Sequence, residues 1–114
     1  MPFIQAKLTG RIDRGKEEVL QAKLTEAAVS TLGKPKSYVM VGIEEGCMLW
    51  MAGKRLGKGA FVSVRLLGTP TRDACAALAR QITDILVKEC GVDGKSVYVS
   101  FHPVENWALD GNLL

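Results

Sequence analysis

The first eight residues of the chain alternate in hydrophobic character with a period of two. Apolar residues occupy one side of that period: Pro2, Ile4, Ala6 and Leu8. The other side carries Phe3, Gln5 and Lys7. This alternation predicts a strand with one buried face that begins at Pro2, a position that proline tolerates because it has no N–H to give to a ladder.

A helical period follows this strand. Apolar residues recur at helical spacing through the next segment: Leu20, Leu24, Ala27, Ala28 and Leu32. Asp13 is placed to cap the start of this helix and Gly33 to cap its end. A second strand is expected from the alternation of Val39, Val41 and Ile43 with Tyr38, Met40 and Gly42. Because a helical crossover joins the two strands, they should be parallel, and the first half is predicted to be a βαβ unit.

Gly46 and Gly53 bracket the apolar segment 47–51, which we expect to form a short strand or flap. The pattern of the first half then recurs in the second half, where Gly91 stands 58 positions after Gly33. The same offset relates the apolar positions of the strands and helix to a second set: Val62, Val64, Leu66, Leu78, Ile82, Ile85, Leu86, Val97, Val99 and Phe101. The repeat predicts one domain over residues 1–114, with halves at about 1–55 and 59–114. Its fold class should be α/β (α+β), with a four-stranded mixed sheet and both helices on one face.

The sheet face away from the helices determines whether the chain should assemble. It would carry a mixture of aromatic and polar side chains: Phe3, Gln5, Lys7, Tyr38, Met40, Phe61, Ser63, Arg65, Tyr98 and Ser100. This mixture is too aromatic for plain solvent exposure and too polar for a second core, so it favours burial against other subunits of a homo-oligomer. The alternative is a solvated sheet with a few exposed aromatics.

Charge and composition exclude several classes of function. The net charge is only +3, and neither a basic stripe nor interleaved aromatics indicates a nucleic-acid surface. The chain has no apolar run long enough for a membrane span and no signal-peptide pattern, so we expect a cytoplasmic protein without membrane partners. Cys47, Cys75 and Cys90 lack C-x-x-C spacing, which argues against a disulfide framework or a zinc site and favours buried apolar fillers.

The candidate chemistry begins at Pro2. Initiator methionine is normally removed before a residue as small as proline, which would leave a secondary amine on the buried side of a sheet. The pKa of a free α-amino group is about 7.7 to 8.0, and burial or a nearby cation lowers it by disfavouring the charged form. Such an amine would be a general base at neutral pH. The alternative is that Pro2 only opens a strand.

Several segments, in their order along the chain, resemble the macrophage migration inhibitory factor family. They are Pro2-Phe3-Ile4, Leu32-Gly33-Lys34-Pro35, Tyr38-Val39-Met40, Leu66-Leu67-Gly68, Val97-Tyr98-Val99 and Trp107. The segment 101–107 is most similar to the D-dopachrome tautomerase branch. The resemblance spans the whole chain. It implies a homotrimer of tandem βαβ protomers, with a keto–enol tautomerase site at each subunit interface and no cofactor.

The resemblance also implies roles for individual residues. Pro2 matches the catalytic proline, and Lys34 matches the lysine that faces the substrate carboxylate. Five positions match substrate contacts: Tyr38, Leu67, Tyr98, Ser100 and Trp107. Tyr98 would reach in from the neighbouring protomer, and Ser100 takes the place of an asparagine. The implied activity is an isomerase acting on aromatic α-keto acids of the phenylpyruvate type and on dopachrome.

Alternatives remain for the function and for some residues. The chain could be a cytokine-like signalling protein, secreted without a signal peptide, whose trimer binds a cell-surface receptor and whose pocket is vestigial. Lys34 could serve only as a cation at the end of the first helix, and His102, the only histidine, is expected at the surface. The C-terminal segment 106–114 departs from the family pattern, which leaves the preferred substrate open.

Overall fold

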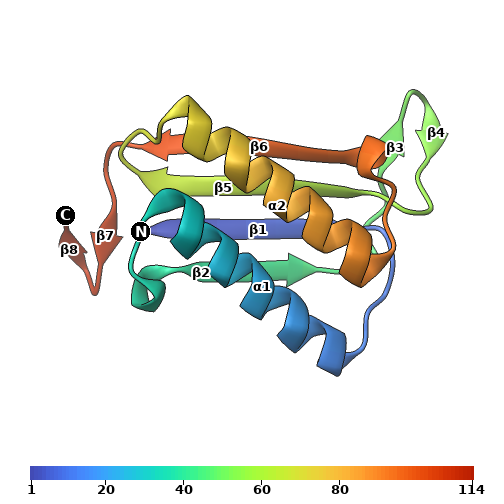
Figure 1. The fold of residues 1–114 in the computed structure, drawn as a ribbon, viewed down its shortest axis with the longest axis horizontal. Coiled ribbons are helices and arrows are strands. Elements are labelled where there is room, and N and C mark those ends of the chain that lie inside the picture. The colour runs from blue at the N-terminus through green and yellow to red at the C-terminus, as the bar shows by residue number, and fades with distance from the viewer.

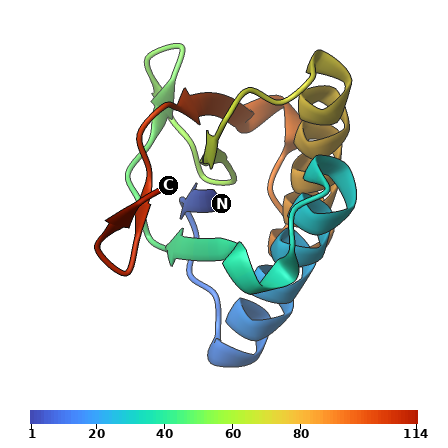
Figure 2. The same ribbon diagram turned by 90° about the vertical axis from the view of Figure 1, so that its left-hand side faces the viewer.

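The computed structural model describes residues 1–114 and contains one four-stranded sheet with two long helices packed against one face (Figures 1 and 2). The strand order is β2-β1-β5-β6. These strands are β1 (Pro2–Leu8), β2 (Met40–Glu44), β5 (Ala60–Leu67) and β6 (Val97–Val104). The outer pairs β1·β2 and β5·β6 are parallel, and the central pair β1·β5 is antiparallel. The mixed sheet predicted from the sequence is therefore confirmed.

The helices α1 (Arg14–Leu32) and α2 (Arg72–Cys90) begin and end with the same local structures. The Asp13 carboxylate accepts a hydrogen bond from the N–H of Lys16 at 2.7 Å, and the Thr71 hydroxyl accepts one from the N–H of Ala74 at 3.1 Å. Each helix ends at a glycine with a φ of 65°, a left-handed conformation that glycine adopts without steric cost. The predicted caps of α1 are thus confirmed.

The tandem repeat extends into the short elements. The 3₁₀ turn η1 (Lys36–Tyr38) corresponds to η2 (Gly94–Ser96), and the hairpin of β3 (Trp50–Met51) and β4 (Lys54–Arg55) corresponds to that of β7 (Ala108–Leu109) and β8 (Asn112–Leu113). Both hairpin turns place two consecutive residues at positive φ, as tight hairpins of matching twist require. Figure 1 shows the two hairpins at opposite ends of the sheet.

Two local expectations were wrong. Tyr38 and Val39 are not part of the second strand, because Tyr38 donates its N–H to the carbonyl of Pro35 at 3.1 Å and closes the turn η1. The segment 47–51 is not one strand or flap, since only Trp50 and Met51 pair, within the hairpin.

The core lies between the helices and the near face of the sheet. It joins alternate residues of β1 and β5 to the inner faces of both helices, including Ile4, Val64, Leu24 and Ile82, all of which are fully buried. Lys16 and Lys23 of α1 form ion pairs with the largely buried carboxylate of Glu89 of α2 at 3.7 and 3.4 Å, which link the two helices. The three cysteines are free and half-buried. Cys90 packs against the core, whereas Cys47 and Cys75 do not, so the expectation of buried apolar fillers is wrong for Cys47 and Cys75. Neither helix is long and apolar enough to cross a membrane.

Candidate active site

Pro2 occupies the first position of a central strand, on the face that the helices cover. It is less than 2% exposed, and it lies opposite Leu66 in the antiparallel pairing of β1 with β5. Pro2 therefore sits at the end of the sheet where β5 finishes. In a chain that begins with Met1, the Pro2 nitrogen is an amide and the free amine belongs to Met1.

The amine of Met1 reports on the surroundings of the N-terminus. Its pKa lies below the ordinary value of 8.0, first because burial penalises the charged form and second because the positive charge of Lys34 is near. Met1 is half-buried, whereas Pro2 is fully buried. Removal of Met1 would make the Pro2 nitrogen the N-terminal amine. This amine would lie deeper in the same environment.

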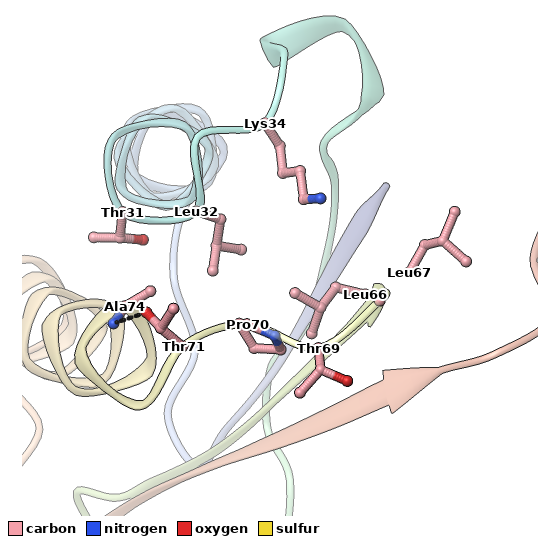
Figure 3. Close-up of a pocket in the computed structure, with 10 residues that line it drawn as sticks. Thr31, Leu32, Lys34, Leu66, Leu67, Thr69, Pro70, Thr71 and Ala74 are labelled. Carbon is pink, nitrogen blue, oxygen red and sulfur yellow. Dashed lines mark hydrogen bonds between the residues drawn. The ribbon is translucent and has the colours of Figure 1, made fainter.

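The end of α1 positions Lys34. Gly33 donates its N–H to the carbonyl of Val29 at 3.1 Å in a left-handed cap, which turns the chain out of the helix just before Lys34. Figure 3 shows the Lys34 side chain extending from this turn toward Leu66 at the end of β5. Lys34 is half-buried and takes part in none of the four ion pairs of the chain. Its charge is available to an anionic ligand.

A cavity of about 400 Å³ lies where the end of α1, the end of β5 and the start of α2 meet (Figure 3). Its lining contains two of the candidate site residues, Lys34 and Leu67. The remaining lining residues were not expected to belong to the site: Thr31, Leu32, Leu66, Gly68, Thr69, Pro70, Thr71 and Ala74. A second hollow, also of about 400 Å³, lies beside β6 and shares Leu67, Gly68 and Thr69 with the first. The loop after β5 thus separates two open spaces at the Pro2 end of the sheet.

The backbone of Leu67 is linked to the N-terminus. Its N–H donates a hydrogen bond to the carbonyl of Met1 at 3.3 Å. This bond requires Met1, so removing Met1 would leave the N–H of Leu67 as a free donor beside the new N-terminal amine. Pro2 itself does not line the cavity that contains Lys34 and Leu67. This end of the sheet would then offer a base, a cation and a hydrogen-bond donor, which are the groups needed to move a proton next to a carbonyl.

Tyr38 and Trp107 lie at this end of the sheet but do not line the cavity that contains Lys34. Tyr38 is 47% exposed in the turn before β2, whose first residue, Met40, pairs with Phe3. Trp107 is half-buried, and its carbonyl accepts the N–H of Leu114 at 2.9 Å in the C-terminal hairpin. Figures 1 and 2 both place that hairpin near the N-terminus.

Tyr98 and Ser100 lie away from Pro2 within one chain. In β6, Tyr98 pairs with Phe61, whereas Leu66, the partner of Pro2, pairs with Pro103 five positions further on. At about 3.3 Å per residue this separation is about 17 Å, too far for Tyr98 to reach its own Pro2. Tyr98 is 60% exposed and contacts Phe61 edge to face, with ring centroids 6.4 Å apart. A single chain therefore does not bring these two residues to the candidate site.

The tandem βαβ sheet with a buried N-terminal strand is a tautomerase-type fold. The family profile described as macrophage migration inhibitory factor (MIF) matches residues 1–112, and the chain belongs to that family. It is 25% identical over 114 residues to a D-dopachrome decarboxylase of Gallus gallus, with 98% of this chain and 94% of that protein covered.

Two solved structures show the same fold. Leishmania major MIF2 is 23% identical, with a TM-score of 0.91 and coverage of 100% of this chain and 97% of that chain. A protein described as Q0 fused 4-OT wild type symmetric trimer is also 23% identical, with a TM-score of 0.82 and coverage of 90% and 85%. These structural similarities confirm the fold expected from the sequence, and the profile match over residues 1–112 confirms the family.

Proposed function

We propose that the chain, after removal of Met1, is a keto–enol tautomerase that acts on aromatic α-keto acids of the phenylpyruvate type and on dopachrome. The observation that carries the proposal is the place of Pro2, fully buried at the start of β1 opposite Leu66, beside an N-terminus where burial and then the charge of Lys34 lower the pKa of the Met1 amine. Membership of the macrophage migration inhibitory factor family, with a D-dopachrome decarboxylase among its relatives, supports the reaction class.

The proposed reaction moves one proton between carbon and oxygen. The Pro2 nitrogen, as a neutral base, takes a proton from the carbon next to the keto group, and a carbon–carbon double bond forms as the electrons of the carbonyl π bond move to oxygen. The protonated Pro2 then gives that proton to the oxygen, which becomes the enol hydroxyl. In the reverse direction the protonated Pro2 returns the proton to carbon. One group serves as base and as acid, because its pKa is brought toward the working pH.

The other groups would bind and orient the substrate. Lys34 would hold the carboxylate, and the freed N–H of Leu67 would donate to the keto oxygen, where negative charge develops. Tyr38 and Trp107 would flank the aromatic ring from the same end of the sheet. The chemistry involves no net redox change and requires no cofactor.

The site would be completed by a second copy of the chain in a homotrimer. Tyr98 is 60% exposed, Met40 is 66% exposed and Phe61 is 40% exposed, all on the sheet face that the helices leave uncovered. Aromatic and methionine side chains on such a face are typical of interfaces. In the trimer, Tyr98 and Ser100 of one chain would approach Pro2 of its neighbour. Sedimentation should therefore give a particle of three chain masses, and a monomer at micromolar concentration would contradict the shared site.

The direct test follows ketonisation of phenylpyruvate enol by its absorbance. The protein must be shown by mass spectrometry to begin at Pro2. We expect a rate that is proportional to enzyme concentration and saturates with the enol. A rate equal to that of buffer would contradict the tautomerase proposal. Dopachrome, assayed in parallel, tests whether the second substrate class is also accepted.

A further inference from the structure

The hairpin of β3 and β4 lies at the end of the sheet that holds Tyr98, away from Pro2 of the same chain (Figure 1). Trp50 is the first residue of β3 and is 58% exposed, close to the 60% of Tyr98. Trp50 does not belong to the core between the sheet and the helices. Packing within one chain therefore does not account for this large apolar side chain.

Backbone hydrogen bonds fix the base of this hairpin to the sheet. The N–H of Leu56 donates to the carbonyl of Leu49 at 2.9 Å, which closes the hairpin around Trp50. The Thr9 hydroxyl donates to the carbonyl of Gly57 at 3.1 Å and accepts the N–H of Gly59 at 3.0 Å. Trp50 is thus carried on a segment with a defined position relative to β1 and β5.

A hollow of about 70 Å³ lies where the hairpin meets the starts of β5 and β6. Its lining is apolar or aromatic apart from Ser96, and it includes the rings of Trp50, Phe61 and Tyr98. Phe61 and Tyr98 meet edge to face, and the Arg55 guanidinium lies 6.0 Å from the centroid of the Trp50 ring. Three aromatic side chains of one chain therefore gather around one hollow.

We propose that Trp50 is a specificity-determining residue of the shared site, where it contacts the aromatic ring of a substrate held at Pro2 of the neighbouring chain. This role rests on the proposed function, in which Tyr98 enters that neighbour's site. Because Trp50 and Tyr98 line one hollow, the chain that supplies Tyr98 brings Trp50 to the same place. Aromatic pairs attract beyond the area that they bury, so a ring-bearing α-keto acid gains a contact that an aliphatic one lacks.

The tandem repeat supports this position for Trp50. Ala108 begins β7 at the position 58 residues after Trp50, and Trp107 directly precedes Ala108. Each hairpin therefore carries a tryptophan where it begins, one at the Pro2 end of the sheet and one at the Tyr98 end. In the trimer, the substrate ring lies between Trp107 of the chain that supplies Pro2 and Trp50 of the chain that supplies Tyr98.

The test compares a substrate with a ring and a substrate without one. Exchange of the C3 protons of phenylpyruvate and of 2-oxobutanoate for deuterium, followed by NMR, reports the same proton removal from both. Trp50→Ala should raise KM for phenylpyruvate by about threefold to tenfold, as loss of an aromatic pair does, and leave KM for 2-oxobutanoate unchanged. The kcat values and the pH profile should not change, because Trp50 contacts the ring and not the amine. Trp50→Phe should have an intermediate KM for phenylpyruvate.

Lys54→Ala is the matched control. Lys54 pairs with Met51 in the same hairpin, but it is exposed and does not line the hollow, so both KM values should stay unchanged. If Trp50→Ala left KM for phenylpyruvate unchanged, or changed both substrates equally, the role of Trp50 would be overturned while the tautomerase proposal stood. Absence of exchange with the unmodified protein would instead overturn the tautomerase proposal.

Mixed trimers test whether Trp50 acts across the subunit interface. Processed Trp50→Ala chains supply the base, and an excess of chains extended before Pro2 lacks the base but supplies Trp50. Most active sites in such trimers combine Pro2 of the first chain with Trp50 of the second, so KM for phenylpyruvate should return to the unmodified value. A KM that stayed at the value of the Trp50→Ala trimer would overturn the proposal.

Discussion

The carbonyl of Met1 accepts a hydrogen bond from the N–H of Leu67 at 3.3 Å. Met1 thus accepts the hydrogen bond of the Leu67 N–H, the donor that the family resemblance assigns to the substrate. The peptide bond between Met1 and Pro2 also makes the Pro2 nitrogen non-basic. Retention of Met1 blocks two functional groups at once. Processing of the N-terminus would expose a base and a hydrogen-bond donor together.

The first prediction follows from this relationship. A chain that keeps Met1, or that carries an extra residue before Pro2, should lose enol ketonisation activity by a factor of about 10² to 10⁴, the usual contribution of a positioned proton transfer. Activity assays on mass-verified processed and extended forms measure this directly. Pro2→Gly with a free N-terminus retains a primary amine and should keep part of the activity. Equal activity of the extended and processed chains would leave Pro2 as the first residue of a strand only.

The second prediction concerns Lys34. Because its charge contributes to lowering the pKa of the N-terminal amine, Lys34→Ala should raise that pKa, although burial remains as the larger cause. The neutral base then appears only at higher pH, so the acid limb of the kcat/KM profile should move upward. KM for a carboxylate substrate should rise more than kcat falls, since the ion pair is present in both the ground state and the transition state.

Lys36→Ala is the matched control for Lys34→Ala. Lys36 lies two residues after Lys34, at the start of η1, but it is exposed and pairs with Glu26 at 3.1 Å. We expect the KM and the pH profile of the Lys36→Ala variant to match those of the unmodified protein. Coincident pH profiles of Lys34→Ala and Lys36→Ala would assign Lys34 to the end of α1 rather than to the site.

Much of the fold could be predicted because the two halves carry the same strong periodicities. Pro2 begins a strand as the alternation indicates, and Gly33 and Gly91 end helices of equal length. The second strand does not include Tyr38, although the sequence predicted that it would, and the reason is local. Tyr38 continues the alternation of β2, but the backbone hydrogen bond to Pro35 closes a turn there, and alternation alone does not register such a turn.

The site could be predicted only in part. Lys34 and Leu67 were found through a family resemblance, and the structure brings them to one cavity. Thr69 and Thr71 of the same cavity were not identified as site residues, because they come from a loop and a helix cap that carry no chemical motif. The separation of Tyr98 from Pro2 depends on strand register, which pattern alone does not give.

A third prediction concerns the packing of Gly59, which lies between β4 and β5. A β-carbon at this buried position would lie 2.7 Å from Leu56 and 2.9 Å from the carbonyl of Ser96. Gly59→Ala should therefore lower the free energy of unfolding by about 1–3 kcal/mol, as overpacking does elsewhere. Gly57→Ala, where a β-carbon meets no atom within 4 Å, is the control. Denaturant unfolding of the two variants should differ by this amount, and equal midpoints would show that the backbone yields at Gly59.

The final prediction tests whether the site is shared. Tyr98 lies about 17 Å along β6 from Pro103, the residue level with its own Pro2, so its ring can act only on the Pro2 of another copy. A chain extended before Pro2 lacks the base but keeps Tyr98, whereas processed Tyr98→Ala keeps the base but lacks the ring. Each alone should have low activity. Trimers that combine the two chains contain sites with both groups intact, so co-assembly should raise activity above that of either parent, with sedimentation confirming the mixed particle. Mixed trimers no more active than their parents would remove Tyr98 from the site.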